Sequence, residues 1–145
     1  MQAAVEIVDW APGTPRQLRP KLRLVSKTLT AGELIGERIT AECRAIENAE
    51  SLSMAELQRR VAAWLVVPGL DERALNGGRR IFGPGAALED GANPEVQIAV
   101  ARKAFARGQF VMLFDGEQIE SWDQRIAIRD DSVATFIKMI PLRGG

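Results

Sequence analysis

The strongest fold signal in this 145-residue chain lies in the stretch Gln109-Phe110-Val111-Met112-Leu113-Phe114-Asp115-Gly116-Glu117-Gln118-Ile119-Glu120. Its apolar first half leads into Asp115-Gly116, a pair that favours a tight turn because both residues tolerate left-handed backbone angles. A second short run follows the turn. The stretch therefore predicts two antiparallel strands joined by a tight turn.

Two further extended segments follow this hairpin. Arg125-Ile126-Ala127-Ile128 predicts a short extended or single-turn segment, and Ala134-Thr135-Phe136-Ile137-Lys138-Met139-Ile140 predicts a final strand. That strand leads directly into Pro141-Leu142-Arg143-Gly144-Gly145, so we expect residues 141–145 to form a flexible tail. Two glycines in succession are thin enough to enter a narrow enzyme channel and leave the carboxyl carbon unhindered. The tail is therefore a candidate reactive group, and a frayed end is the alternative.

Upstream, two segments predict a first hairpin. Val5-Glu6-Ile7-Val8-Asp9-Trp10 alternates apolar and polar residues as a half-buried strand does, and Lys21-Leu22-Arg23-Leu24-Val25 repeats the pattern. Residues 11–20 between them contain three prolines and a glycine. This composition predicts a loop longer than the two-residue connections of tight hairpins.

Helix signals follow the first hairpin. Thr30-Ala31-Gly32-Glu33 has the spacing of a capping box, which predicts that a helix begins there. Steps of four, four and three residues then define one apolar stripe, formed by Ile35, Ile39, Cys43 and Ile46. Charged residues lie mostly around that stripe: Glu37, Arg38, Glu42, Arg44 and Glu47.

Two more helices are predicted in the middle of the chain. A second capping box at Ser53-Met54-Ala55-Glu56 opens one helix, which Pro68-Gly69 closes. Residues 75–94 are rich in turn signals, but they lack the glycine-lysine-serine/threonine pattern of a phosphate loop. A further helix is predicted between residues 93 and 108. Its signals are Asn93 as cap, Pro94 at the first helical position and Gly108 beyond the end. We expect that helix to carry Val96, Val100 and Phe105 on its apolar side.

Composition narrows the possible functions. Nineteen basic residues balance nineteen acidic ones, so no whole-chain field draws the protein to nucleic acid or to an anionic membrane. The absence of histidine and the single Cys43 exclude a histidine base, an internal disulfide and a structural zinc site. We expect Cys43 to be a buried core residue. No basic leader followed by an apolar stretch is visible at the start, so we expect a cytoplasmic protein.

Strand, strand, helix, strand, short strand, strand is the order of a β-grasp sheet wrapped on one helix. On these residues the chain resembles the ubiquitin family. The corresponding ubiquitin segment reads Gln-Arg-Leu-Ile-Phe-Ala-Gly-Lys-Gln-Leu-Glu, with polarity similar to Gln109–Glu120 at most positions. The closing Leu-Arg-Gly-Gly is the same in both, and 29 positions separate Gly116 from Gly145, which is ubiquitin's interval.

The resemblance implies an α+β, β-grasp fold with a mixed sheet packed on one helix. Residues 50–108 stand where ubiquitin has a short connection, so we expect a helical insertion there within a single domain, 1–145. The chain is in this respect similar to the larger bacterial ubiquitin-like proteins, which accompany activating and conjugating enzymes. Pro141 replaces an arginine of the ubiquitin tail, and this departure implies dedicated partner enzymes.

The resemblance also implies a function. Gly145, preceded by Gly144, is the conjugation site of a protein modifier, and Leu142 and Arg143 are grip residues for its partners. Leu113, Ile137 and Met139 fall near the apolar patch that ubiquitin uses for binding. The chain itself is then no enzyme, contains no catalytic or metal site and holds no cofactor, because ATP and magnesium are used by the activating enzyme. Its partners are that enzyme, a conjugating enzyme, a deconjugating protease and a target protein, with no nucleic acid and no membrane.

Two alternatives remain open at this point. The same fold and tail serve sulfur carriers, in which the terminal glycine becomes a thiocarboxylate, although those proteins are near the minimal fold. The other alternative is a β-grasp binding module whose tail is inert.

Overall fold

The computed structural model describes residues 3–48, 65 and 93–139. The chain divides into two compact units, one formed by Met1–Ile35 with Arg102–Gly145 and the other by Gly36–Ala101. Both boundaries fall inside helices, because α1 spans Ala31–Asn48 and α5 spans Pro94–Ala106. In the described part of the chain, neither helix combines the length and apolarity needed to cross a membrane.

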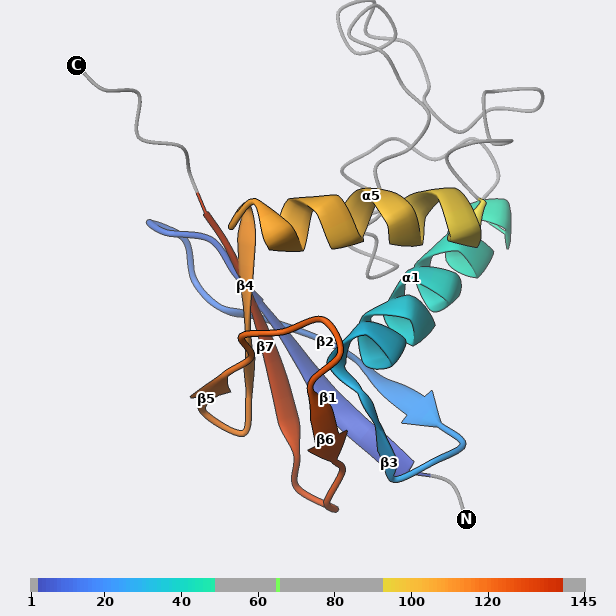
Figure 1. Cartoon of the computed structure of the whole chain (residues 1–145), viewed down its shortest axis with the longest axis vertical. Coiled ribbons are helices and arrows are strands. Elements are labelled where there is room, and N and C mark those ends of the chain that lie inside the picture. Colours follow the sequence, from blue (N-terminus) through green and yellow to red (C-terminus); the bar gives the residue numbers. More distant parts are fainter. Residues whose placement is uncertain (1–2, 49–64, 66–92, 140–145) are drawn as a thin grey trace, which may run out of the picture. The chain divides into compact units, whose positions relative to one another are not determined.

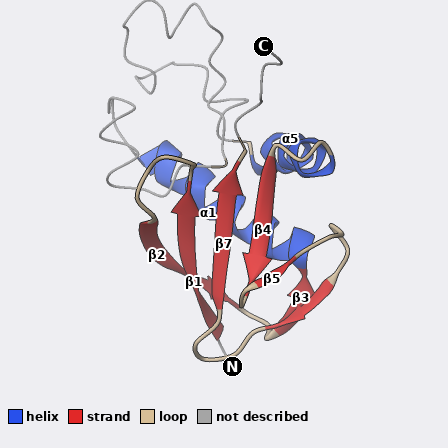
Figure 2. Ribbon diagram, turned by 90° about the vertical axis from the view of Figure 1, so that its left-hand side faces the viewer, coloured by secondary structure: helices blue, strands red, loops and turns tan. Residues whose placement is uncertain are grey.

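The main element of the first unit is a mixed five-stranded sheet (Figures 1 and 2). Its order is β2-β1-β7-β4-β5, with β1 parallel to β7 and every other pair antiparallel. The strands are β1 (Ala3–Trp10), β2 (Gln17–Leu24), β4 (Phe110–Phe114), β5 (Glu117–Gln118) and β7 (Val133–Lys138). The strands predicted from the sequence are confirmed, and the chain is α+β.

The first hairpin differs from its prediction in the extent of the loop. β2 begins at Gln17, so the connection is shorter than residues 11–20. Proline 20 is accommodated because β2 is an edge strand and because the register with β1 shifts between Val5 and Ile7, which face Leu22 and Arg19. An edge position and a bulge are the two places where a strand tolerates the missing N–H of proline.

A second, two-stranded sheet joins β3 (Thr28–Thr30) to β6 (Arg125–Ala127), with Leu29 opposite Ile126. The extended segment predicted at residues 125–128 is thus confirmed. Its partner was not predicted, since a three-residue strand has too short a pattern to be recognised.

One face of the five-stranded sheet is buried. Its core side chains alternate along the three central strands and include Val5, Ile7, Met112, Ala134 and Phe136. An aromatic series runs through the same unit, since the ring centroids of Phe105 and Phe110 lie 5.8 Å apart and those of Phe110 and Phe136 lie 6.2 Å apart.

Capping interactions define the starts of both helices. Thr30 N donates to Glu33 Oε1 at 2.9 Å, and Glu33 N donates to Thr30 Oγ1 at 3.1 Å, which confirms the predicted capping box. The backbone hydrogen bond from Thr30 is the main cause that lowers the pKa of Glu33 below its ordinary value of 4.5. At α5, Asn93 Oδ1 accepts from Glu95 N at 3.0 Å, and Gly108 follows the helix with a φ of 70°.

The described side chains of the apolar stripe predicted on α1 are buried, whereas α5 buries a different pair from the one predicted and its Phe105 is half-buried. Ile35, Ile39 and Cys43 of α1 are buried as expected, but Val96 and Val100 of α5 are 39 % and 42 % exposed. Gln97 and Ala101 are the buried side chains of α5. Each follows one of the two predicted valines by one residue, so the buried side of the helix is shifted by one position. The side chain of Ile46, the predicted helix after Ser53 and the turns of residues 75–92 lie outside the described residues.

The tight turn at Asp115-Gly116 forms as predicted, with φ angles of 51° and 86°. The Asp115 carboxylate accepts hydrogen bonds from Val133 N at 2.8 Å and from Ser132 Oγ at 2.9 Å. The turn between β4 and β5 is therefore tied to the start of β7.

Trp122 is packed directly against the first turn of α1. Gly32 N donates to Trp122 O at 2.8 Å, and a Cβ added at Gly32 would overlap the indole ring. The Phe105 ring meets the same indole edge-on at a centroid distance of 5.9 Å. Glycine is thus required at position 32 by close approach.

We expect Gly32→Ala to lower the free energy of unfolding by about 1–3 kcal/mol, because the added methyl group displaces Trp122. Gly36→Ala is the matched control in the same helix, since a Cβ there only reaches ordinary contact with Ile98. The control gains helix propensity of up to about 1 kcal/mol. Chemical denaturation of both variants checks this, and equal stability of the two would contradict the packing described.

Candidate functional site

The second face of the five-stranded sheet carries apolar side chains that are not fully buried. At one level of the sheet, Trp10 lies opposite Ile137, which in turn lies opposite Val111. All three are half-buried. Residues directly opposite one another share a face, so these side chains form one row across β1, β7 and β4.

A second row lies two residues away along the strands. Leu18, Val8, Thr135 and Leu113 face one another in that order across β2, β1, β7 and β4. Leu18 is 68 % exposed and the other three are half-buried. Residues two apart on a strand share a face and lie about 6.6 Å apart, so the two rows are adjacent and form a continuous surface.

Met139 extends this surface beyond the end of β7. It lies two residues past Ile137, the spacing of side chains on one face, and it is 44 % exposed. We call the resulting surface the outer apolar face, formed by Val8, Trp10, Leu18, Val111, Leu113, Ile137 and Met139.

The structure places Leu113, Ile137 and Met139 on one face of the sheet. Their role in binding a partner stays a prediction. The structure adds four residues that the sequence analysis did not single out: Val8, Trp10, Leu18 and Val111. The register of β1 against β7 is the missing information, because a parallel pairing of distant segments leaves no local signal in the sequence.

Trp10 is held in place at the end of β1. Its indole Nε1 donates to Thr14 O at 3.0 Å, and the Arg16 guanidinium carbon lies 5.1 Å from the ring centroid. A cation at this distance from an indole face is attracted to the ring. The loop of the first hairpin therefore contributes a cationic rim beside the outer apolar face.

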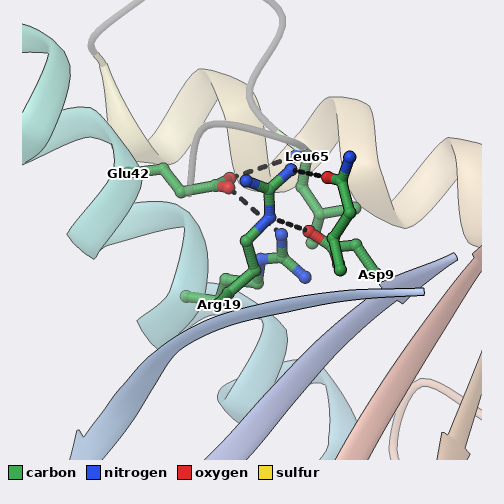
Figure 3. A network of polar contacts seen from close by, with 6 residues as sticks. Asp9, Arg19, Glu42 and Leu65 are labelled. Carbon is green, nitrogen blue, oxygen red and sulfur yellow. Dashed lines mark hydrogen bonds and ion pairs between the residues drawn. The ribbon is translucent and has the colours of Figure 1, made fainter. Parts of the chain in front are cut away.

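The inner side of the same hairpin contains a buried ion pair (Figure 3). Arg19 Nε donates to Asp9 Oδ2 at 2.9 Å, and the Asp9 side chain is 1 % exposed. Another Arg19 nitrogen donates to Gln17 Oε1 at 2.7 Å. The apolar–polar alternation predicted for the first strand does not hold throughout. Its two acidic residues, Glu6 and Asp9, lie on opposite faces, and Asp9 is buried.

A second buried ion pair belongs to the other unit. Arg38 Nη2 donates to Glu42 Oε2 at 3.3 Å, with side chains 3 % and 2 % exposed. Glu42 Oε1 accepts from Leu65 N at 3.1 Å, as Figure 3 shows. The charged residues predicted around the apolar stripe are therefore not all exposed, since Arg38 and Glu42 are buried. A buried carboxylate of this kind is stable because several donors meet it.

The predicted tail sites cannot be placed in the same way. Leu142, Arg143, Gly144 and Gly145 lie outside the described residues. The described chain reaches Met139, directly after the central strand β7. Among the described residues, cysteine, aspartate and glutamate side chains form no group of three that could hold a metal ion.

Comparisons with protein-family models, curated proteins and solved structures find no match to this chain. The function therefore has to be argued from the site itself.

We expect Glu42→Leu to lower the free energy of unfolding by roughly 3–5 kcal/mol, because the buried Arg38 loses a charged partner. Glu37→Leu on the exposed side of the same helix is the control and changes stability by less than about 0.5 kcal/mol. The double variant Arg38→Met/Glu42→Leu recovers most of the loss, since no buried charge is left. Thermal or chemical unfolding measures all three, and a Glu42→Leu effect no larger than the control would show that the pair is not buried.

Proposed function

We propose that this chain is a ubiquitin-like protein modifier with a β-grasp fold, and that the Gly145 carboxylate is its reactive group. The observation that carries the proposal is the position of β7, which lies between β1 and β4 and ends at Lys138, with three residues between it and the Leu142–Gly145 segment. A strand hydrogen-bonded on both sides fixes the end of β7, beyond which the chain continues to its last residues.

The strand arrangement supports the fold half of the proposal. A β-grasp sheet has its first and last strands as parallel neighbours at its centre, and β1 and β7 have this relation. The tight turn at Gly116 connects β4 to the short β5, as the resemblance to ubiquitin implies. The order β2-β1-β7-β4-β5 is compatible with this fold.

The chemistry follows from the properties of a carboxyl terminus. A terminal carboxylate has a reference pKa of about 3.5, so it is an anion at neutral pH and resists nucleophiles. Attack by this carboxylate on the α-phosphate of ATP, with departure of pyrophosphate, gives an acyl adenylate on the partner enzyme. A partner thiolate then displaces AMP, and a target amine displaces the thiol to form an amide.

Cys43 is unsuited to supply that thiol. It is buried, with 1 % of its surface exposed, and it lies in the middle of α1. A reactive cysteine needs access to solvent and an environment that favours the thiolate. The thiol therefore belongs to the partner.

The outer apolar face provides the surface by which partners hold the body of the modifier. An exposed apolar surface with a polar rim is typical of protein-binding sites. The outer apolar face includes Met139, which lies shortly before the tail in the sequence. A partner bound to this face would therefore hold the tail close to the partner's catalytic site.

We expect the protein, mixed with ATP, magnesium and the enzymes encoded beside its gene, to become attached to another protein. Deletion of Gly145 abolishes the attachment, and Cys43→Ala leaves it intact. Intact-mass spectrometry distinguishes the outcomes, because a gain of one sulfur in place of oxygen would indicate a sulfur carrier. An unchanged mass in every reaction would contradict both activities and leave a binding module.

We further expect Leu113→Ser with Ile137→Ser to raise the KM for activation about tenfold or more, with little change in kcat, because contacts with the partner are lost. Val96→Ser is the control, as it removes an exposed apolar side chain of α5 that is not part of the outer apolar face. Initial rates of ATP–pyrophosphate exchange at varied modifier concentration give both constants. An equal KM for all three proteins would exclude the outer apolar face from this step.

A further inference from the structure

The charges of the sheet are divided between its two edges, although the whole chain is neutral. Residues 16–27 contain no acidic side chain and form β2 and its flanks. Their basic residues are Arg16, Arg19, Lys21, Arg23 and Lys27. On the other side, residues 109–124 cover β4 and β5 and contain four acidic residues and no basic one. β2 and β5 are the two edge strands, so the sheet has one basic and one acidic edge.

Most of the basic side chains on β2 and its flanks are available for a partner. Arg19 is used internally in its pair with Asp9. Lys21, Arg23 and Lys27 are exposed, and none of them makes an ion pair with another described residue.

Apolar side chains are interleaved with these cations. Leu18 and Val25 are 68 % and 88 % exposed, the two most exposed large apolar side chains in the described part of the chain. Leu18 also lies opposite Val8, so this edge is continuous with the outer apolar face. Within the described residues of the unit, no packing contact accounts for two such exposed apolar side chains among the cations Arg16, Lys21, Arg23 and Lys27.

We propose that this basic edge, formed by Arg16, Leu18, Lys21, Arg23, Val25 and Lys27, binds an acidic segment of a partner protein that carries apolar side chains between its carboxylates. The carboxylates meet the cations, and the apolar side chains cover Leu18 and Val25. Binding is through side chains and not by addition of a strand, because Pro20 offers no N–H and the bulge twists the edge.

The same features disfavour other occupants. A second copy could present its acidic edge, but residues 109–124 include no large apolar side chain among the exposed ones to cover Leu18 and Val25. An anionic membrane would attract the basic edge but repel the acidic edge of the same small unit.

The test is a titration of the ¹⁵N-labelled full chain with a synthetic peptide that repeats Glu-Glu-Leu, followed by NMR. We expect shift changes confined to residues 16–27 and the Trp10 indole, and weaker binding at higher ionic strength. Lys21→Glu/Arg23→Glu weakens binding about tenfold or more. The matched control is Lys103→Glu/Arg107→Glu, which makes the same charge change at exposed positions of and after α5 and leaves binding unchanged.

Several results would overturn the proposal. If both double variants weakened peptide binding equally, or if NMR shift changes were spread over all the basic residues of the chain, the peptide would be bound by nonspecific electrostatic attraction. Equally tight binding of an all-glutamate peptide would remove the role of Leu18 and Val25. Signal loss only with phosphatidylserine vesicles would indicate a membrane, and peptide-free self-association abolished by Lys21→Glu/Arg23→Glu would indicate a second copy. None of these results depends on whether Gly145 is conjugated.

Discussion

The parallel pairing of β1 with β7 is the interaction on which the rest of this structure depends. It joins Glu6–Trp10 to Val133–Ile137, two segments from opposite ends of the chain, at the centre of the sheet. Because side chains alternate along each strand, this one register decides both faces at once. It places Val5, Ile7, Ala134 and Phe136 in the core, and Val8, Trp10 and Ile137 on the outer apolar face. A slip by one residue would exchange the two sets.

The same pairing connects the fold to its proposed function. Because β1 and β7 are parallel, they end at the same end of the sheet. Trp10, the last residue of β1, and Arg16 of the following loop therefore lie near the end of β7, from which the chain continues to its glycines. The modifier hypothesis needs a rigid body, a surface for partners and a tail close to that surface. The β1–β7 pair forms the centre of the sheet, aligns Val8, Trp10 and Ile137 on the outer apolar face, and ends where the chain continues toward the tail. The Asp9–Arg19 pair adds a side-chain hydrogen bond between β1 and β2.

Local signals in the sequence were enough to predict much of the fold. The capping box at Thr30 and Glu33, the Asn93-Pro94 start of α5 and the Asp115-Gly116 turn each act over a few residues, and the structure confirms all three. The wrong predictions concern features that depend on tertiary packing and not on neighbouring residues. Periodicity around α1 could not reveal that Arg38 and Glu42 pair within a buried environment, nor could Pro20 be recognised as compatible with an edge strand. For the candidate site, Leu113, Ile137 and Met139 were found by resemblance, whereas Val8, Trp10, Leu18 and Val111 required the register of the sheet.

The central claim is that Gly145 forms an amide with an amine of another protein, and peptide mapping of the product tests it most directly. Trypsin cleaves after Arg143, so a target lysine modified by this chain keeps Gly144-Gly145 on its ε-amino group. Tandem mass spectrometry should find this two-glycine remnant on lysines of a partner or target, only when ATP and the activating enzyme are present. A product whose terminal tryptic peptide is recovered as free Gly-Gly or as its thiocarboxylate, with no lysine modified, would contradict the account.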